Sequence, residues 1–262
     1  MRSGHYCVMK WPERPLPGAA QQAEYEYQMK KLELRIGDLS RYSIQAVMAD
    51  RYDEITEILR ALNKDSHLKY IFVSGSAQDF APLGRDRIEQ LAHSLGEETI
   101  SRGFNLVSGL GWGIGGAVTL GAIEQIYADS LLMDRLLLLP FPQSAPASMT
   151  RENFHHAFRT NMISNAGFSV FICGNREIDG VITVGRGVLE EFAITHDLGR
   201  YTVPIGATGH AAKQIWDEVS RNPEAYFGEK NVSEELAVLG DPESSNEQLL
   251  AAVFGMIDKL SR

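Results

Sequence analysis

Short apolar runs alternate with longer amphipathic segments over most of the chain. Five runs are rich in branched and aromatic residues and end in a turn residue: YIFVSG (70–75), FNLVSG (104–109), RLLLLP (135–140), SVFICG (169–174) and YTVPIG (201–206). Runs without a polar face are typical of parallel strands that are buried on both sides. Segments with a helical period lie between and after them, at 85–102, about 115–130, about 154–166, 187–199 and 210–221. This alternation predicts a doubly wound, Rossmann-like α/β parallel sheet, which binds ligands at the carboxyl ends of its strands.

The first 65 residues do not continue this pattern. WPERPLPGAAQ has the composition of a loop, and the periodicity beyond it predicts three elements: a helix over 23–42, a strand over 43–49, and a second helix over 50–63 with Asp50 at its N-cap. One strand between two helices cannot close a hydrophobic core. We therefore interpret residues 1–65 as the tail of another α/β domain and residues 66–262 as the sheet domain.

The composition narrows the classes of function. No apolar run approaches the ~18 residues needed to cross a bilayer, and the N-terminus has no apolar signal core, so we expect a soluble cytoplasmic protein without a membrane partner. A formal net charge of −9 disfavours nucleic acid as a partner, because such binding needs a basic face. Cys7 and Cys173 have neither CxxC nor histidine spacing, which implies no disulfide and no bound metal.

Glycines gather where the predicted strands end. Gly75 and Ser76 follow the first strand, where backbone N–H groups and a hydroxyl can meet an anionic oxygen. The stretch GLGWGIGG allows two peptide planes to lie against a ribose or a pyrophosphate, through Gly109, Gly111 and Gly113. The helix after it would direct its positive end to the same place. A tight turn with close helix packing explains such glycines equally well.

Trp112 lies within this glycine-rich loop. An indole is costly to expose and suits stacking on a nucleobase. A hydrophobic plug beneath the loop is the alternative, and the sequence leaves both interpretations open.

Three charged residues complete the candidate site. Arg159 lies in FRTNMISNAG, Arg176 directly follows a predicted strand, and Glu191 is expected in the first turn of the next helix. A guanidinium donates to phosphate through a fork of N–H groups, and a carboxylate accepts from the vicinal hydroxyls of ribose. Taken singly, an arginine can be a solvated surface residue, and a glutamate can complement its helix N-terminus. Their common edge of the sheet favours a ligand site.

GRGVLEEF is similar to the PGGxGTxxE motif of the LOG family of nucleoside-phosphate phosphoribohydrolases. Glu191 matches the final glutamate, and Arg159 lies near that family's catalytic arginine. The chain departs from this motif at three positions. Thr183 replaces its proline, and two residues of its phosphate-binding turn are also replaced, a glycine by Val184 and a threonine by Val188. These departures argue against hydrolysis but not against binding of a nucleotide.

Residues from about 69 to 225 more closely resemble the SLOG sensor domain of the Thoeris anti-phage effectors. The resemblance rests on six strings in order: FVSGSA, NLVSGLGWGIGGAV, RLLLLPFPQ, FRTNMISNAGFSVFICGNREIDG, GVLEEF and VPIGATGHAAKQIWDEV. It implies binding of a cyclic ADP-ribose isomer that a partner TIR-domain enzyme makes, and activation of an attached NAD hydrolase. It also places Arg159, Arg176 and Glu191 at ligand-contacting positions, with arginine at 176 where lysine also occurs.

The first 65 residues resemble the last strands and helix of the sirtuin-like domain of the same effectors, through GHYCVMKW and LSRYSIQAVMADRYDEITEILRAL. The sequence holds no candidate for that domain's glycine-rich NAD loop or catalytic asparagine and histidine, so we expect no NAD hydrolysis and no cofactor for this chain alone. The resemblance implies a homo-oligomer. Residues 246–260 predict an amphipathic helix that packs on the sheet domain or on a neighbouring subunit.

Three functions from different classes remain open at this point. The sensor for a cyclic ADP-ribose isomer is our preferred hypothesis. The alternatives are a LOG-like nucleoside 5′-monophosphate phosphoribohydrolase and an oligomerisation module with a vestigial pocket.

Overall fold

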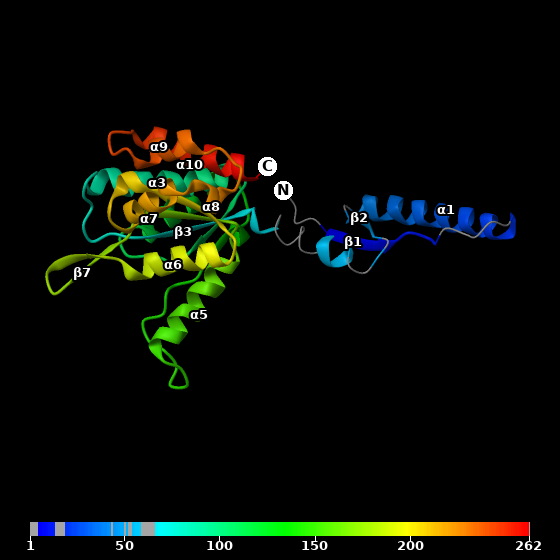
Figure 1. Cartoon of the computed structure of the whole chain (residues 1–262), viewed down its shortest axis with the longest axis horizontal. Helices are drawn as coiled ribbons and strands as arrows, with labels where there is room; N and C mark the ends of the chain where they lie inside the picture. Colours follow the sequence, from blue (N-terminus) through cyan, green and yellow to red (C-terminus); the bar gives the residue numbers. More distant parts are fainter. Residues whose placement is uncertain are drawn as a thin grey trace. The chain divides into compact units, whose positions relative to one another are not determined.

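A computed structural model describes residues 5–13, 19–42, 44–49, 51, 54–58 and 66–261. The chain divides into two units, Met1–Asp65 and Ser66–Arg262. In the smaller unit, strands β1 (His5–Lys10) and β2 (Ile44–Ala49) form a parallel pair, and helix α1 (Ala19–Arg41) packs against β2 (Figure 1). Residues 54–58 are helical, within the predicted helix 50–63, whereas Asp50 and 59–63 lie outside the described residues.

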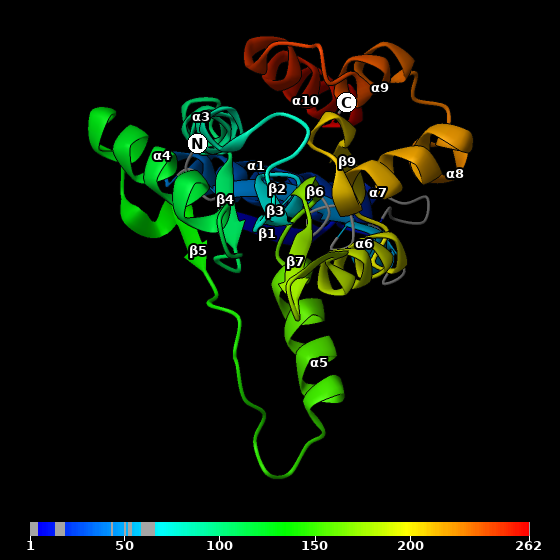
Figure 2. The same cartoon turned by 90° about the vertical axis from the view of Figure 1, so that its left-hand side faces the viewer.

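The larger unit is built around a five-stranded sheet in which all neighbours are parallel. Its strands are β3 (Tyr70–Ser76), β4 (Asn105–Ser108), β5 (Leu136–Leu138), β6 (Phe168–Cys173) and β9 (Tyr201–Ile205), in the order β5-β4-β3-β6-β9 (Figure 2). The chain winds outward from β3 in one direction and then from β6 in the other. This topology confirms the predicted doubly wound α/β fold and places its switch point between β3 and β6.

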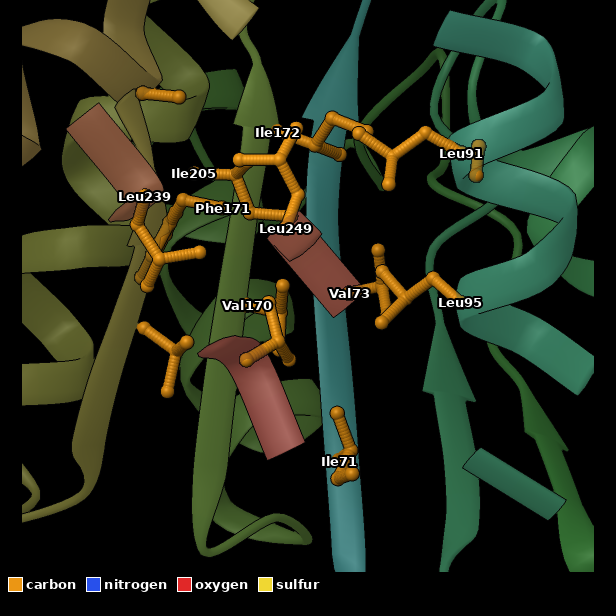
Figure 3. Packing of buried hydrophobic residues seen from close by; sticks show 14 of the residues in the cluster. Ile71, Val73, Leu91, Leu95, Val170, Phe171, Ile172, Ile205, Leu239 and Leu249 are labelled. Atoms are coloured by element: carbon orange, nitrogen blue, oxygen red, sulfur yellow. The ribbon is translucent and has the colours of Figure 1, made fainter. Parts of the chain in front are cut away.

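Alternate residues of β3 reach opposite faces of the sheet, because side chains alternate along a strand. Ile71 and Val73 join a cluster with residues of α3 (Arg85–Ser101), α9 (Ser233–Gly240) and α10 (Asn246–Ser261), including Leu91, Leu95, Leu239 and Leu249 (Figure 3). On the other face, Phe72 packs with residues of α5 (Arg151–Ser164) and α6 (Arg186–Asp197), namely Met162 and Ile194. Both faces of the strand are therefore covered, as its continuous apolar run predicts.

The apolar face of α10 is covered within the larger unit itself. Leu249, Val253 and Ile257 are fully buried, and the helix contacts α3, α9 and β9. Of the two surfaces expected to receive this helix, the sheet domain is the correct one. The helix therefore gives no support of its own to self-association.

Several short elements escaped the sequence pattern. They are the 3₁₀ turns η1 (Met133–Arg135) and η2 (Gly206–Thr208), the helix α8 (Pro223–Phe227), the helix α9, and a hairpin of β7 (Asn175–Ile178) and β8 (Val181–Val184). The hairpin projects from the body of the unit beside α6 (Figure 1). The helices α4 (Gly115–Ala128) and α7 (His210–Arg221) match their predicted ranges closely. None of the helices described here combines the length and apolar character needed to cross a bilayer.

Candidate functional site

A cleft of about 480 Å³ opens at the carboxyl edge of the sheet. Its walls come from the end of β3, the loops after β4 and β5, the helix α5, the first residues of β7 and the beginning of α6. Eight of the nine predicted site residues line it: Gly75, Ser76, Gly109, Gly111, Trp112, Arg159, Arg176 and Glu191. Gly113 does not. The fold thus brings residues from six separate segments to one cleft, at the edge where α/β sheets bind ligands.

The glycine-rich loop packs with its backbone directly on the residues after β3. A Cβ atom at position 111 would lie 1.9 Å from the carbonyl oxygen of Gly75, and one at position 113 would lie 2.3 Å from that of Ala77. Gly113 also has a φ of +76°, which disfavours any other residue. The Ala77 N–H donates to the Trp112 carbonyl oxygen at 2.8 Å. Close packing therefore explains Gly111 and Gly113, and Gly113 shapes the loop from outside the cleft.

Trp112 is 75% exposed and lines the cleft. The interpretation of this residue as a plug beneath the loop is therefore wrong, because its indole lies on the outside. The Phe141 ring is engaged differently: the Arg159 guanidinium lies 4.5 Å from its centroid, and the His155 and Phe158 rings meet it edge-on at 4.8 and 5.4 Å. Trp112 thus offers a free aromatic face to a ligand, whereas Phe141 supports Arg159.

Arg159 is held in place within the wall that α5 contributes. This helix starts after Thr150, whose hydroxyl accepts the Asn153 N–H, and Arg159 lies two turns further along. The side chain is only 13% exposed, and its Nη1 donates to Glu190 Oε2 at 2.9 Å. Its Nε forms an ion pair with Glu191 Oε1 at 3.4 Å and is buried without a hydrogen-bond partner among the described residues.

Glu191 is the sixth residue of α6 and so lies in its second turn. The expected place in the first turn is wrong, because the helix begins at Arg186, and the carboxylate is too far along to complement the helix N-terminus. The Ser74 hydroxyl donates to Glu191 Oε2 at 2.5 Å. Burial raises the pKa of Glu191 above its ordinary value, against the opposing effects of the Ser74 hydrogen bond and the Arg159 charge.

Ser76 contacts the first residue of the hairpin, next to Arg176. The Ser76 hydroxyl donates to the Asn175 carbonyl oxygen at 2.9 Å, so its proton is already used and it offers a ligand only an acceptor. The buried Asn175 side chain accepts the N–H groups of both Gln78 and Asp79 at 2.9 Å, which fixes the loop after β3 to the hairpin. Arg176 is exposed, and its guanidinium makes no ion pair with any described residue.

The hairpin itself could have been found from the sequence. Asp179 and Gly180 have φ values of 51° and 78°, as a two-residue hairpin turn requires, and an Asp-Gly pair between apolar residues predicts such a turn. Three residues of the site gave no comparable signal. Ser74 and Gln143 line the cleft, and Glu190 binds Arg159 beside it.

Neither cysteine belongs to the cleft. Both are free thiols, as expected, and burial raises the pKa of Cys173 to about 12, which keeps its sulfur protonated and unreactive. Within the described residues, no group of histidine, cysteine, aspartate and glutamate side chains is arranged to hold a metal ion. The charges of the cleft are thus those of two arginines and one carboxyl group whose burial favours its neutral form, an arrangement suited to an anionic ligand.

Comparison with known proteins agrees with this architecture. A family model described as the Sir2- and TIR-associating SLOG family matches residues 54–260. The chain is 35% identical over 261 residues to the NAD(+) hydrolase ThsA of Bacillus cereus (strain MSX-D12), and 31% identical over 265 residues to that of Cytobacillus dafuensis. Each alignment covers 98% of this chain and 54% of the relative.

A third relative, the NAD(+) hydrolase ThsA of Acinetobacter baumannii (strain 532279), is 34% identical over 231 residues, which cover 85% of this chain and 48% of that protein. The chain therefore spans about half the length of the curated relatives it matches. Because the family model covers residues 54–260, which include all the elements that form the cleft, the chain belongs to the Sir2- and TIR-associating SLOG family.

Proposed function

We propose that the larger unit is a sensor that binds a cyclic ADP-ribose isomer in the cleft and thereby activates NAD hydrolysis in a longer effector protein. A TIR-domain enzyme supplies the signal, and the response depletes NAD during phage infection in the cytoplasm. The relatives named as NAD hydrolases are about twice as long as this chain, so the hydrolytic activity is assigned to the longer protein. Residues 1–65 are proposed to be the end of its sirtuin-like domain.

One observation carries this proposal. Arg159, Arg176 and Glu191 converge on a single cleft with an exposed indole, although they come from a helix, a hairpin and a second helix. Two guanidinium groups suit the two charges of a pyrophosphate, the carboxyl group suits ribose hydroxyls, and Trp112 suits a base. The volume of about 480 Å³ lies within the range of small-ligand pockets.

Calorimetric titration of the chain with cyclic ADP-ribose isomers tests the proposal directly. Saturable binding with one site per chain is expected for at least one isomer. Absence of binding to every isomer, in protein with a cooperative thermal transition, would contradict it.

Phosphoribohydrolase activity is the second candidate, and a specific contact favours it. Arg159 Nε lies 3.4 Å from the carboxylate of Glu191; Glu191 matches the LOG family's glutamate, and Arg159 lies near the position of its catalytic arginine. Incubation with nucleoside 5′-monophosphates, followed by chromatography for released base, separates the two functions. Base release that is abolished by Glu191→Gln would establish the hydrolase, and intact nucleotides are expected for the sensor.

The proposal also makes the chain inactive toward NAD by itself. Purified chain is expected to leave NAD intact with and without a cyclic ADP-ribose isomer. Sustained NAD loss that a substitution within residues 1–65 abolishes would refute this part. Self-association remains part of the proposal, and sedimentation across micromolar concentrations with and without the isomer measures it.

A further inference from the structure

Glu190 links the wall of the cleft to the surface of the protein. Its Oε2 accepts the hydrogen bond from Arg159 Nη1 at 2.9 Å, and its Oε1 lies 3.1 Å from His156 Nδ1. The side chain is 35% exposed and does not line the cleft. Glu190 therefore touches a ligand-facing residue from behind, without facing the ligand space itself.

Arg159 lies between two carboxylates that compete for it. Glu190 accepts a hydrogen bond from Nη1, whereas Glu191 Oε1 forms a longer ion pair with Nε at 3.4 Å. The edge formed by Nε and Nη2 is only partly free. Nε is buried and ion-paired with Glu191, whereas Nη2 makes no hydrogen bond with any described residue and is the group on this edge that can donate to a phosphate. If the guanidinium turned to pair fully with Glu191, that edge would be occupied.

The other neighbours of Arg159 do not restrain this rotation. The Phe141 ring at 4.5 Å supports the plane of the guanidinium, but a flat ring does not fix rotation within that plane. Gly187 lies against the guanidinium and leaves room for it because it has no side chain; a Cβ atom there would lie 2.6 Å from Nη2. Of the two carboxylate contacts described for Arg159, the hydrogen bond from Nη1 to Glu190 at 2.9 Å is shorter than the ion pair of Nε with Glu191 at 3.4 Å, and it therefore contributes most to the orientation of the guanidinium within its plane.

We propose that Glu190 is a positioning residue: its bond to Nη1 keeps Arg159 from pairing with Glu191 through both Nε and Nη2, which leaves Nη2 for a phosphate and the Glu191 carboxyl for a hydroxyl donor. This inference rests on the proposed function for the nature of the ligand. It assigns opposite roles to two adjacent glutamates: Glu191 faces the ligand, and Glu190 orients the arginine.

Glu190 also has a second effect on binding, which opposes the first. Glu190 is an anion near the site of an anionic ligand, so its direct repulsion weakens binding, and Glu190→Ala would relieve it. Positioning predicts the reverse, a loss of affinity. The sign of the change therefore distinguishes the two effects.

The first test needs no ligand. Crystal structures of the full chain are compared for the parent, Glu190→Ala and Glu190→Gln. In Glu190→Ala the guanidinium is expected to turn onto Glu191, and in Glu190→Gln the amide oxygen is expected to keep Nη1 in place. An Arg159 side chain in the same position in all three structures would overturn the inference, whatever the ligand proves to be.

The second test measures affinity by calorimetry with the cyclic ADP-ribose isomer that the parent binds. Glu190→Ala is expected to bind about tenfold more weakly, equivalent to about 1.4 kcal/mol, and Glu190→Gln to recover most of that loss. In an Arg159→Ala background, Glu190→Ala should add no further loss. Tighter binding by Glu190→Ala, or an equal loss in both backgrounds, would refute positioning. A parent that binds no isomer refutes the proposed function, and the crystallographic test then still decides the role of Glu190.

Discussion

Removal of the Arg159 side chain is the sharpest test of the candidate site. Only 13% of this side chain is exposed; its Nη1 is bonded to Glu190 and its buried Nε is ion-paired with Glu191, so Nη2, which makes no hydrogen bond with the described residues, is the group left for a ligand. Truncation of one partner of a buried, hydrogen-bonded charge pair costs about 2–5 kcal/mol. At about 1.4 kcal/mol per tenfold, Arg159→Ala should weaken binding of the cyclic ADP-ribose isomer by about 30-fold to a few thousand-fold.

Isothermal titration calorimetry measures this change, and thermal unfolding of each variant reports whether the fold is retained. Arg221→Ala is the matched control, because Arg221 is exposed at the end of α7 and makes no ion pair with the described residues. Arg200 is less suitable, since its guanidinium is partly buried and donates to the Ser164 carbonyl oxygen at 3.3 Å. If Arg159→Ala and Arg221→Ala both bind within about threefold of the parent, less than 1 kcal/mol, the ligand lies elsewhere.

Further predictions concern the other walls of the cleft. Arg176→Ala should weaken binding about tenfold or more with an unchanged Tm, because the side chain is exposed, and Arg176→Lys should lose less because its charge remains; equal affinities for all three proteins would contradict this. Trp112→Ala should cost about 1–3 kcal/mol of binding with little change in stability, and calorimetry with Trp112→Phe should show partial recovery. Gly111→Ala should lower the Tm and abolish binding, because its Cβ would lie 1.9 Å from a backbone oxygen, whereas Gly116→Ala meets open space in a helix and should be neutral or stabilising by about 0.5–1 kcal/mol; similar Tm values for both would refute the packing argument. The folded-state pKa of Glu191 is raised above 4.5, so the stability that its protonated form contributes is present below that pH and is lost as the pH rises through the folded value. Glu191→Gln should therefore unfold at a higher temperature than the parent at pH 7 and gain less at pH 4, and a constant difference across that range would show that burial does not control this carboxyl group.

The sequence predicted the secondary structure of the larger unit closely because the signals are local. Strands β3 and β6 are buried on both faces, so most of their residues are apolar, and the helices between them carry one apolar stripe each. The alternation of the two element types was then enough to predict parallel strands and a binding edge at their carboxyl ends. Short elements such as α8 and the β7–β8 hairpin bury too little to leave a comparable pattern.

Only the tertiary structure shows why glycine is needed at position 111 and that Trp112 is exposed. Gly111 faces the backbone of Gly75, far away in the sequence, and no local pattern reports that distance. Similarly, the Ser76 hydroxyl proton is used by Asn175, 99 residues further along the chain. A site residue's free donors and acceptors therefore depend on partners that the chain supplies only after folding.

The sequence by itself determined which residue types reach the binding edge, because each follows a recognisable strand or lies on the helix beside it. It did not determine which charged side chains pair with one another. Arg159 comes from α5, whereas Glu190 and Glu191 are adjacent on α6, and the way these two helices pack decides that Nη1 meets Glu190 while Glu191 is buried against Ser74. Periodicity depends on the local backbone, but the pairing and the pKa of a buried charge depend on the three-dimensional neighbours that replace water around it.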